Sequence, residues 1–128
     1  MADVIEVLDR MFAAIEAGDA DGLAALFADD ITVWHSVTGR TLDKAGSLVI
    51  LRWIMAPGVT RAYEVQERVV DGDRVAQRHR LRVTAAGQPE LDLSVAIFMT
   101  VRDGLVTAIE EYVDGKDTDR LIALIPSA

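Results

Sequence analysis

Two histidines and one glutamate are the side chains of this sequence best suited to acid–base chemistry. His35 and His79 are its only histidines, and the absence of cysteine excludes disulfides, thiolate nucleophiles and thiolate metal sites. Imidazole, with an ordinary pKa of about 6.5, accepts or donates a proton near neutral pH. We therefore take His35, His79 and Glu111 as the candidate catalytic residues and ask which elements must position them.

Alternation along the predicted strands places all three candidates on faces that also carry apolar side chains. Their same-face neighbours are Val33 and Val37 around His35, Leu81 and Val83 beyond His79, and Ile109 and Val113 around Glu111. Glu110 falls on the opposite face. A few polar groups converging on an apolar cavity are typical of a small-molecule site. Because an unpaired buried carboxylate is costly, we expect Glu111 to hydrogen-bond to His35 or His79 and to fix the tautomer of that ring.

The elements that position these residues form a helical first part and a β-rich second part. Helical periodicity and capping residues predict helices over 4–17, from Asp19 to about Asp29 or Asp30, and from Thr41 or Asp43 to about Met55. Strands are predicted over 31–37, 60–70, 74–85, 90–101 and 105–113, followed by a short helix over 117–125. Glycine turns between the last four strands are typical of antiparallel hairpins.

Helices followed by long hairpins indicate an α+β fold, in which a strongly curved, mainly antiparallel sheet wraps the N-terminal helices. A length of 128 residues suits a single domain over 1–128. Thirteen basic and twenty-one acidic residues give a net charge of −8, which argues against a nucleic-acid partner. The sequence shows neither a secretory signal nor a membrane span, so we expect a cytoplasmic protein with no membrane partner.

A stretch near the N-terminus carries a family resemblance. The segments AIEAGDADGL, over 14–23, and LFADDITV, over 26–33, resemble the opening of ketosteroid isomerase. The whole chain is similar to the SnoaL-like, or nuclear-transport-factor-two-like, superfamily, which includes limonene epoxide hydrolases and polyketide cyclases. This resemblance implies a cone-shaped fold with a pocket for a hydrophobic small molecule.

Carried over residue by residue, the resemblance implies that this chain lacks the isomerase's catalytic residues. The isomerase's oxyanion tyrosine corresponds to Met11 and its protonated aspartate to Ile97, and neither side chain can donate the hydrogen bond that a developing enolate needs. Its general-base aspartate corresponds to His35, which can still act as a base. In the epoxide hydrolase pattern, the arginine corresponds to His79 and the last-strand aspartate to Glu111.

The sequence thus predicts a cofactor-independent enzyme that moves a proton on a hydrophobic ligand, as an isomerase, hydrolase, cyclase or lyase. His35 would be the principal base, assisted by His79 and Glu111. These three side chains also have the residue types of a metal-binding facial triad, but we expect no metal. The expected pocket lining is apolar or aromatic: Met11, Trp53, Met55, Tyr63, Val95, Ile97, Met99 and Ile109.

An alternative function and an assembly state also follow from the sequence. Loss of the isomerase's catalytic groups favours, as the alternative, a non-catalytic binding or accessory protein that uses the same pocket. Outward-facing aromatic residues predict a homodimer, because Phe98, Tyr112 and Trp34 would otherwise expose aromatic surface. The outward arginines Arg78, Arg80 and Arg82 are expected to form a solvated stripe or to face the second subunit.

Overall fold

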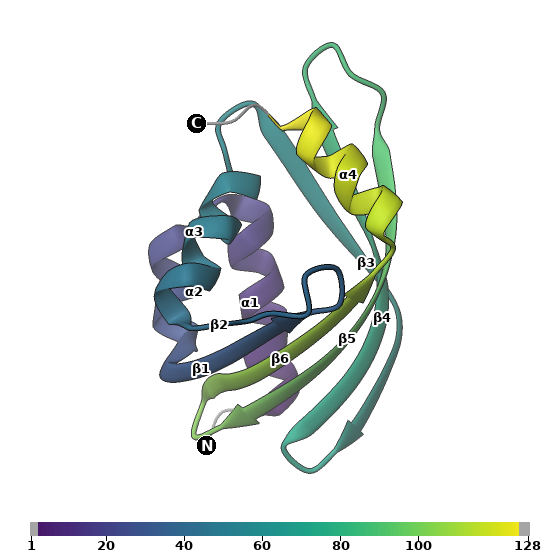
Figure 1. Ribbon diagram of the computed structural model, residues 1–128. Helices are drawn as coiled ribbons and strands as arrows, with labels where there is room; N and C mark the ends of the chain where they lie inside the picture. Colours follow the sequence, from purple (N-terminus) through teal and green to yellow (C-terminus); the bar gives the residue numbers. More distant parts are fainter. Residues whose placement is uncertain (1–2, 126–128) are drawn as a thin grey trace.

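The computed structural model describes residues 3–125, in which one curved sheet of six strands wraps around helices (Figure 1). The helices are α1 (Val4–Ala17), α2 (Ala20–Leu26), α3 (Lys44–Ile54) and α4 (Gly115–Leu124). The strands are β1 (Phe27–His35), β2 (Thr41–Leu42), β3 (Val59–Asp71), β4 (Arg74–Ala85), β5 (Leu91–Arg102) and β6 (Leu105–Val113). The predicted α+β cone fold is confirmed.

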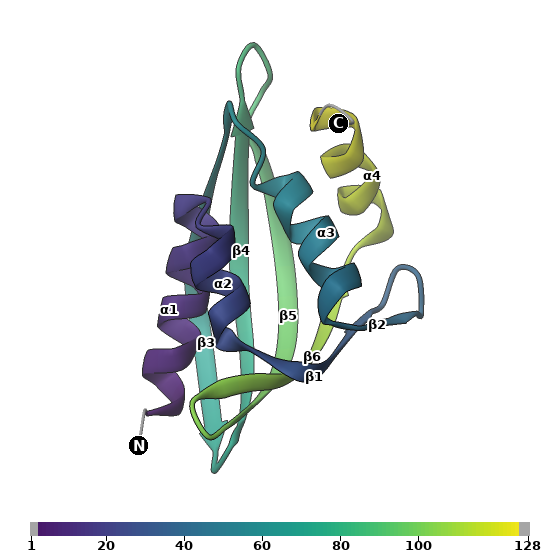
Figure 2. The same cartoon turned by 90° about the vertical axis from the view of Figure 1, so that its left-hand side faces the viewer.

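The sheet has the strand order β2-β1-β6-β5-β4-β3. Strands β3 to β6 are consecutive antiparallel neighbours, as predicted, and the glycines of their three turns have positive φ angles: 60° at Gly72, 78° at Gly87 and 76° at Gly104. The pairing of β1 with β6 is parallel, so the first strand lies beside the last. Figure 2 shows α1, α2 and α3 on one side of the curved sheet, and α4 at the opposite end of β6 from its turn with β5.

The boundaries of the first strand differ from the prediction. Helix α2 ends at Leu26, and β1 begins at Phe27 instead of Ile31, because Phe27 already pairs with Val106 on β6. A register shift follows, and regular pairing resumes at Thr32. Asp29 and Asp30, which suggested the end of a helix, lie exposed in this irregular segment. The strand ends at His35, two residues early, because the chain turns there and the Gly39 amide donates to the His35 carbonyl at 2.9 Å.

Two further boundaries were set by capping residues. Asp43 is the N-cap of α3 and accepts a hydrogen bond from the Gly46 amide, which leaves Thr41 free to pair in the two-residue strand β2. This strand is too short to produce a sequence pattern. Helix α4 begins at Gly115 instead of Asp117, because Asp114 caps it and accepts from the Lys116 amide.

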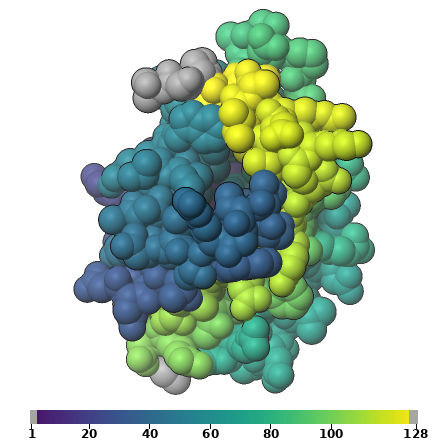
Figure 3. Space-filling model, viewed as in Figure 1, coloured from purple at the N-terminus to yellow at the C-terminus, as the bar shows by residue number. Residues whose placement is uncertain are grey.

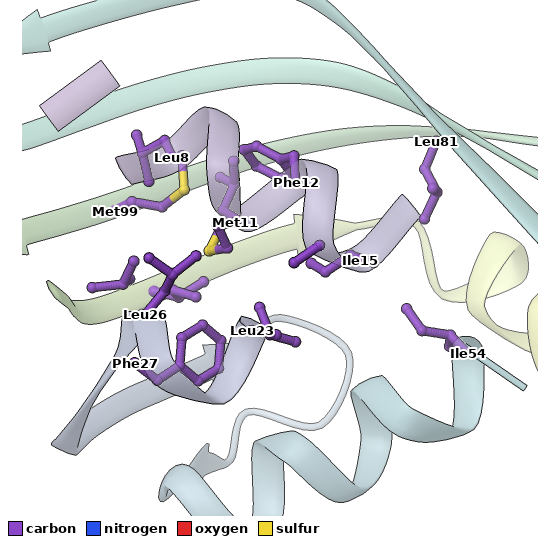
Figure 4. Packing of buried hydrophobic residues seen from close by; sticks show 14 of the residues in the cluster. Leu8, Met11, Phe12, Ile15, Leu23, Leu26, Phe27, Ile54, Leu81 and Met99 are labelled. Carbon is purple, nitrogen blue, oxygen red and sulfur yellow. The ribbon is translucent and has the colours of Figure 1, made fainter. Parts of the chain in front are cut away.

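The hydrophobic core fills the space between α1, α2 and the concave face of the sheet. Figure 4 shows side chains of α1, including Leu8, Met11 and Phe12, packed toward residues from α2 and the strands. Leu8 and Met99 expose 0% and 1% of their surface. Burying each such side chain contributes about 1.5–3 kcal/mol to the free energy of folding, so this packing fixes α1 against the sheet.

Arg61 on β3 joins the C-terminal ends of two helices. Its Nε donates to the Ile15 carbonyl at 2.8 Å, and its Nη2 donates to the Glu16 carbonyl at 3.3 Å. Its Nη1 donates to the carbonyls of Ile54 (2.8 Å) and Val59 (2.9 Å). The last carbonyls of a helix lack partners within it and carry partial negative charge, so a guanidinium suits this position. Arg61 therefore holds α1 and α3 to the sheet.

Candidate functional site

His35 and Glu111 form the closest pair among the candidate catalytic residues. They lie directly opposite each other in the parallel β1–β6 ladder, and His35 Nε2 is 3.4 Å from Glu111 Oε1. Both side chains are half-buried, with 33% and 29% of their surface exposed. Glu111, as hydrogen-bond partner and negative charge, raises the pKa of His35 against the opposing effect of partial burial. Of the two histidines, the one that lies within ion-pair distance of Glu111 is His35.

The backbone around this pair is fixed by Ser36, whose importance the sequence did not reveal. The Ser36 amide donates to the Glu111 carbonyl at 2.9 Å. The Ser36 hydroxyl accepts from the Val113 amide at 3.1 Å and donates to the Val113 carbonyl at 3.3 Å. This residue extends the connection between the two strands one position beyond the end of β1. It thereby holds His35 and Glu111 in register although a turn follows at once.

His79 occupies a different environment on β4. It is 3% exposed, and its ring lies edge-on to Phe12 of α1 and Tyr63 of β3, with centroid distances of 5.4 and 5.2 Å. Gln77 Nε2 is 2.9 Å from His79 Nδ1. Burial lowers the pKa of His79, and this effect outweighs the attraction of Glu111. The ring is therefore neutral near pH 7, in contrast to the raised pKa of His35.

A polar chain that the sequence analysis did not single out leads from His79 to the surface. Gln77 Oε1 accepts from Arg68 Nε at 2.7 Å, and Arg68 Nη1 is 2.9 Å from Asp9 Oδ1 on α1. Gln77 was recognisable because it alternates inward with His79. Arg68 was not, because a register shift between Val65 and Glu67 of β3 changes which side chains face inward.

The sheet register shows which candidates come together. Gln77, Ile97, Glu111 and His35 lie in one row across β4, β5, β6 and β1. His79 lies in the next row, opposite Val95, and two strands from Glu111, which at about 4.8 Å per strand places their backbones roughly 10 Å or more apart. Across residues 3–125, no group of three or more possible metal ligands is found.

The residues predicted to line a pocket belong to the core or its edge. Five of them are buried in the core: Met11, Val95, Ile97, Met99 and Ile109. Three are partly buried and pack against it: Trp53, Met55 and Tyr63. Burial raises the pKa of Tyr63 well above its ordinary value, so its phenol stays protonated. In the view of Figure 3, α3, α4 and the loop after β1 meet around a narrow recess.

The outer face of the sheet carries an aromatic patch formed by Trp34, Phe98 and Tyr112. The Tyr112 ring lies 5.1 Å from Trp34 and 6.0 Å from Phe98, measured between centroids. Phe98 and Tyr112 are 41% and 42% exposed. A surface hollow of about 560 Å³ is lined by residues of both faces, including the predicted site residues His79 and Val95, and a second of about 540 Å³ lies around the turn between β5 and β6. The predicted arginine stripe is also on the outer face, and its members form exposed ion pairs with Glu67, Asp92 and Glu64.

Comparison with models of protein families identifies the family of this chain. The family model of the SnoaL-like domain matches residues 8–109, and the chain belongs to this family. None of the curated proteins is a significant match. Across residues 3–125, no helix is both long enough and apolar enough to cross a membrane.

Solved structures of several activities share the fold. An LEH-like epoxide hydrolase from M. tuberculosis superposes with a TM-score of 0.75 at 19% identity, covering 94% of this chain and 89% of that one. IdmH from Streptomyces antibioticus, a candidate polyketide cyclase, superposes with a TM-score of 0.77 at 23% identity, covering 95% of this chain and 99% of that one. A candidate ketosteroid isomerase from Kribbella flavida superposes with a TM-score of 0.68 at 20% identity, covering 87% of this chain and 77% of that one. At these identities the likeness establishes the nuclear-transport-factor-two-like fold.

Proposed function

We propose that this protein is a cofactor-independent enzyme that binds a hydrophobic small molecule and catalyses a proton transfer, with His35 as its base. The observation that carries the proposal is the His35–Glu111 pair, 3.4 Å apart and partly exposed at the edge of a largely apolar interior. The epoxide hydrolase, cyclase and isomerase folds among similar structures support an enzyme of this general kind. The ligand class would be steroid-, terpenoid- or polyketide-like.

The roles within the pair follow from its contact atoms. Because Nε2 of His35 faces the Glu111 carboxylate, its proton is held there, and Nδ1 keeps the lone pair that accepts a proton from substrate or water. The carboxylate then stabilises the imidazolium, which returns the proton to another atom of the substrate. Since the pKa of His35 is raised, the rate is expected to increase with pH through a midpoint above the ordinary value of about 6.5.

The test is turnover of a panel of cyclic ketones, epoxides and lactones by the unaltered protein and by paired variants. In His35→Gln and Glu111→Gln, turnover should fall about 10²- to 10⁴-fold while the protein remains folded. Glu110→Gln is the matched control, because Glu110 is adjacent in sequence but exposed on the other face. Unchanged turnover in His35→Gln would show that His35 is not the base of the reaction.

A binding protein is the second candidate, and one observation favours it. Met11 and Ile97, at the positions of the isomerase's hydrogen-bond donors, are apolar and only 2% and 4% exposed. On this alternative, His35→Ala and His79→Ala would change ligand affinity only modestly, whereas Ile97→Phe or Val95→Phe would block binding. Fluorescence titration with a polarity-sensitive apolar dye, read beside turnover, separates the two functions.

The proposal includes a homodimer joined through the aromatic patch and a cytoplasmic location. Exposed aromatic surface on the outer face of the sheet supports the dimer. The cytoplasmic location rests on the sequence features that predicted it.

A further inference from the structure

The hydrogen bonds of Gln77 determine which ring nitrogen of His79 carries a proton. A guanidinium has donors and no acceptor, so the Gln77 atom that contacts Arg68 Nε at 2.7 Å must be the carbonyl oxygen. The amide nitrogen of Gln77 therefore faces His79 Nδ1, at 2.9 Å, and it has only N–H groups to offer. Nδ1 must accept this hydrogen bond, and the proton of the neutral ring lies on Nε2.

The same contact opposes protonation of the ring. An imidazolium would turn an Nδ1–H toward the N–H of Gln77, and two donors would then face each other in a buried site. Arg68 adds a positive charge nearby, held in place by Asp9 of α1. From the other side, Glu111 on β6 is the acidic group whose field favours the charged ring, but it is two strands away. The Tyr63 phenol, whose pKa is raised, stays neutral.

The Nε2 edge of the ring has no protein partner among residues 3–125. One side-chain nitrogen in this part of the chain is sealed from water without a hydrogen-bond partner, and it is Arg68 Nη2. His79 Nε2 is therefore not sealed, although the residue as a whole is 3% exposed. A neutral N–H that is held in direction and left without a partner is a hydrogen-bond donor for a ligand.

We infer that Asp9, Arg68 and Gln77 are positioning residues that hold His79 as a neutral Nε2–H donor, so that the two histidines have different tasks. This inference rests on the proposed function. His35, paired with Glu111, exchanges the proton, whereas His79 donates a hydrogen bond to a carbonyl, epoxide or enolate oxygen of the ligand without losing its own proton. A neutral imidazole can polarise a carbonyl in this way.

Nuclear magnetic resonance of the unaltered full-length protein, labelled with ¹⁵N, tests the assignment without any ligand. Long-range ¹H–¹⁵N correlations distinguish protonated from bare ring nitrogens, and a His35→Gln spectrum assigns the two rings. His79 should show a protonated Nε2 and a bare Nδ1 across the neutral range, while His35 titrates. A protonated Nδ1 on His79, or a ring that titrates above its ordinary pKa, would overturn the inference.

Gln77→Glu tests the cause. The new carboxylate can still accept from Arg68 with one oxygen, but its other oxygen attracts an Nδ1–H, so His79 should move to the Nδ1–H or doubly protonated form and its pKa should rise. Gln88→Glu adds the same charge in an exposed turn and should leave the His79 spectrum unchanged. If Gln77→Glu folds and leaves the tautomer unchanged, Gln77 does not set it. If Gln77→Glu does not fold, the spectrum of the unaltered protein still decides.

A matched pair of probes separates this inference from the proposed function. 2-Tetralone and tetralin are similar in shape, but only the ketone accepts a hydrogen bond. The ketone should bind about 5- to 10-fold more tightly than the hydrocarbon, and His79→Phe, which has no donor, should remove this preference. Equal binding of both probes would show that the His79 donor is not used. Failure of both probes to bind would count against the proposed ligand class, while the tautomer assignment stands or falls by its own spectrum.

Discussion

Glu111 lies directly across the β1–β6 ladder from His35, yet the two side chains keep 29% and 33% of their surface in solvent. A deeply buried ion pair depends on its own attraction, because loss of one partner leaves an uncompensated charge. This pair is instead held mainly by its backbone, through the strand ladder and Ser36, and its side chains remain reachable. Its position therefore does not depend on the strength of its own interaction.

We predict a weak energetic coupling within that pair. In a double-mutant cycle with His35→Gln and Glu111→Gln, the coupling energy should be at most about 1 kcal/mol near neutral pH, because partly exposed ion pairs contribute little. Urea unfolding of the four proteins measures it. A coupling of several kcal/mol would identify a buried structural pair and would weaken the proposed catalytic role.

The two histidines should make the free energy of unfolding depend on pH in opposite directions. The folded pKa of His35 is raised, so its contribution is complete below about pH 6.5 and is lost as the pH rises through the folded pKa. The folded pKa of His79 is lowered, so its contribution is complete above about pH 6.5 and is lost as the pH falls through the folded pKa.

Thermal unfolding at about pH 5 and about pH 8 tests these signs. Relative to the unaltered protein, acidification should lower the Tm more in His35→Gln and less in His79→Leu. Gln88→His, which places an imidazole in an exposed turn, should leave the difference between the two pH values almost unchanged. If both histidine variants shifted the Tm difference between the two pH values in the same direction, the direction of the pKa shift given to one of the histidines would be wrong.

Arg61→Met should be strongly destabilising. The substitution keeps much of the apolar stem but removes four hydrogen bonds to carbonyls at the ends of α1 and α3 and beside them, so we expect a loss of about 2–4 kcal/mol. Arg78→Met is the control: it breaks an exposed pair with Glu67 and should cost less than about 1 kcal/mol. Equal losses in denaturant unfolding would contradict the role given to Arg61.

The aromatic patch should mediate dimerisation. Sedimentation velocity at micromolar concentration should show a dimer for the unaltered protein and a monomer for Phe98→Glu, because the substitution removes an aromatic contact and adds a second carboxylate directly opposite Glu110 in the β5–β6 ladder. Val49→Glu places the same charge on an exposed position of α3 and should remain dimeric. A monomeric unaltered protein would refute the proposed assembly.

Periodicity and turn chemistry predicted most of the fold and part of the candidate site. Alternation placed Glu110 outside and Glu111 inside, and the glycine turns gave the hairpins of the last four strands. The irregular pairing of β1 was not predictable, because a bulge leaves no period in the sequence and Asp29 with Asp30 resembles a helix end. Strand β2 is too short to show a pattern.

The polar partners of the site were harder to predict than its histidines. Gln77 lies on the same predicted face as His79, but an amide among apolar residues does not reveal what it contacts. Arg68 faces inward only because the bulge in β3 shifts its register, and Asp9 comes from α1, far away in sequence. Such contacts depend on tertiary packing, which local patterns do not contain.

The parallel pairing of β1 with β6 joins segments from the two halves of the chain. His35 and Glu111 are 111 − 35 = 76 positions apart, and the antiparallel hairpins from β3 to β6 lie between them. Closing so long a loop costs entropy that only the finished sheet repays, so the pair is expected to form late in folding. A partly folded chain that has only its hairpins would lack the paired base, and acid–base activity would therefore report complete folding.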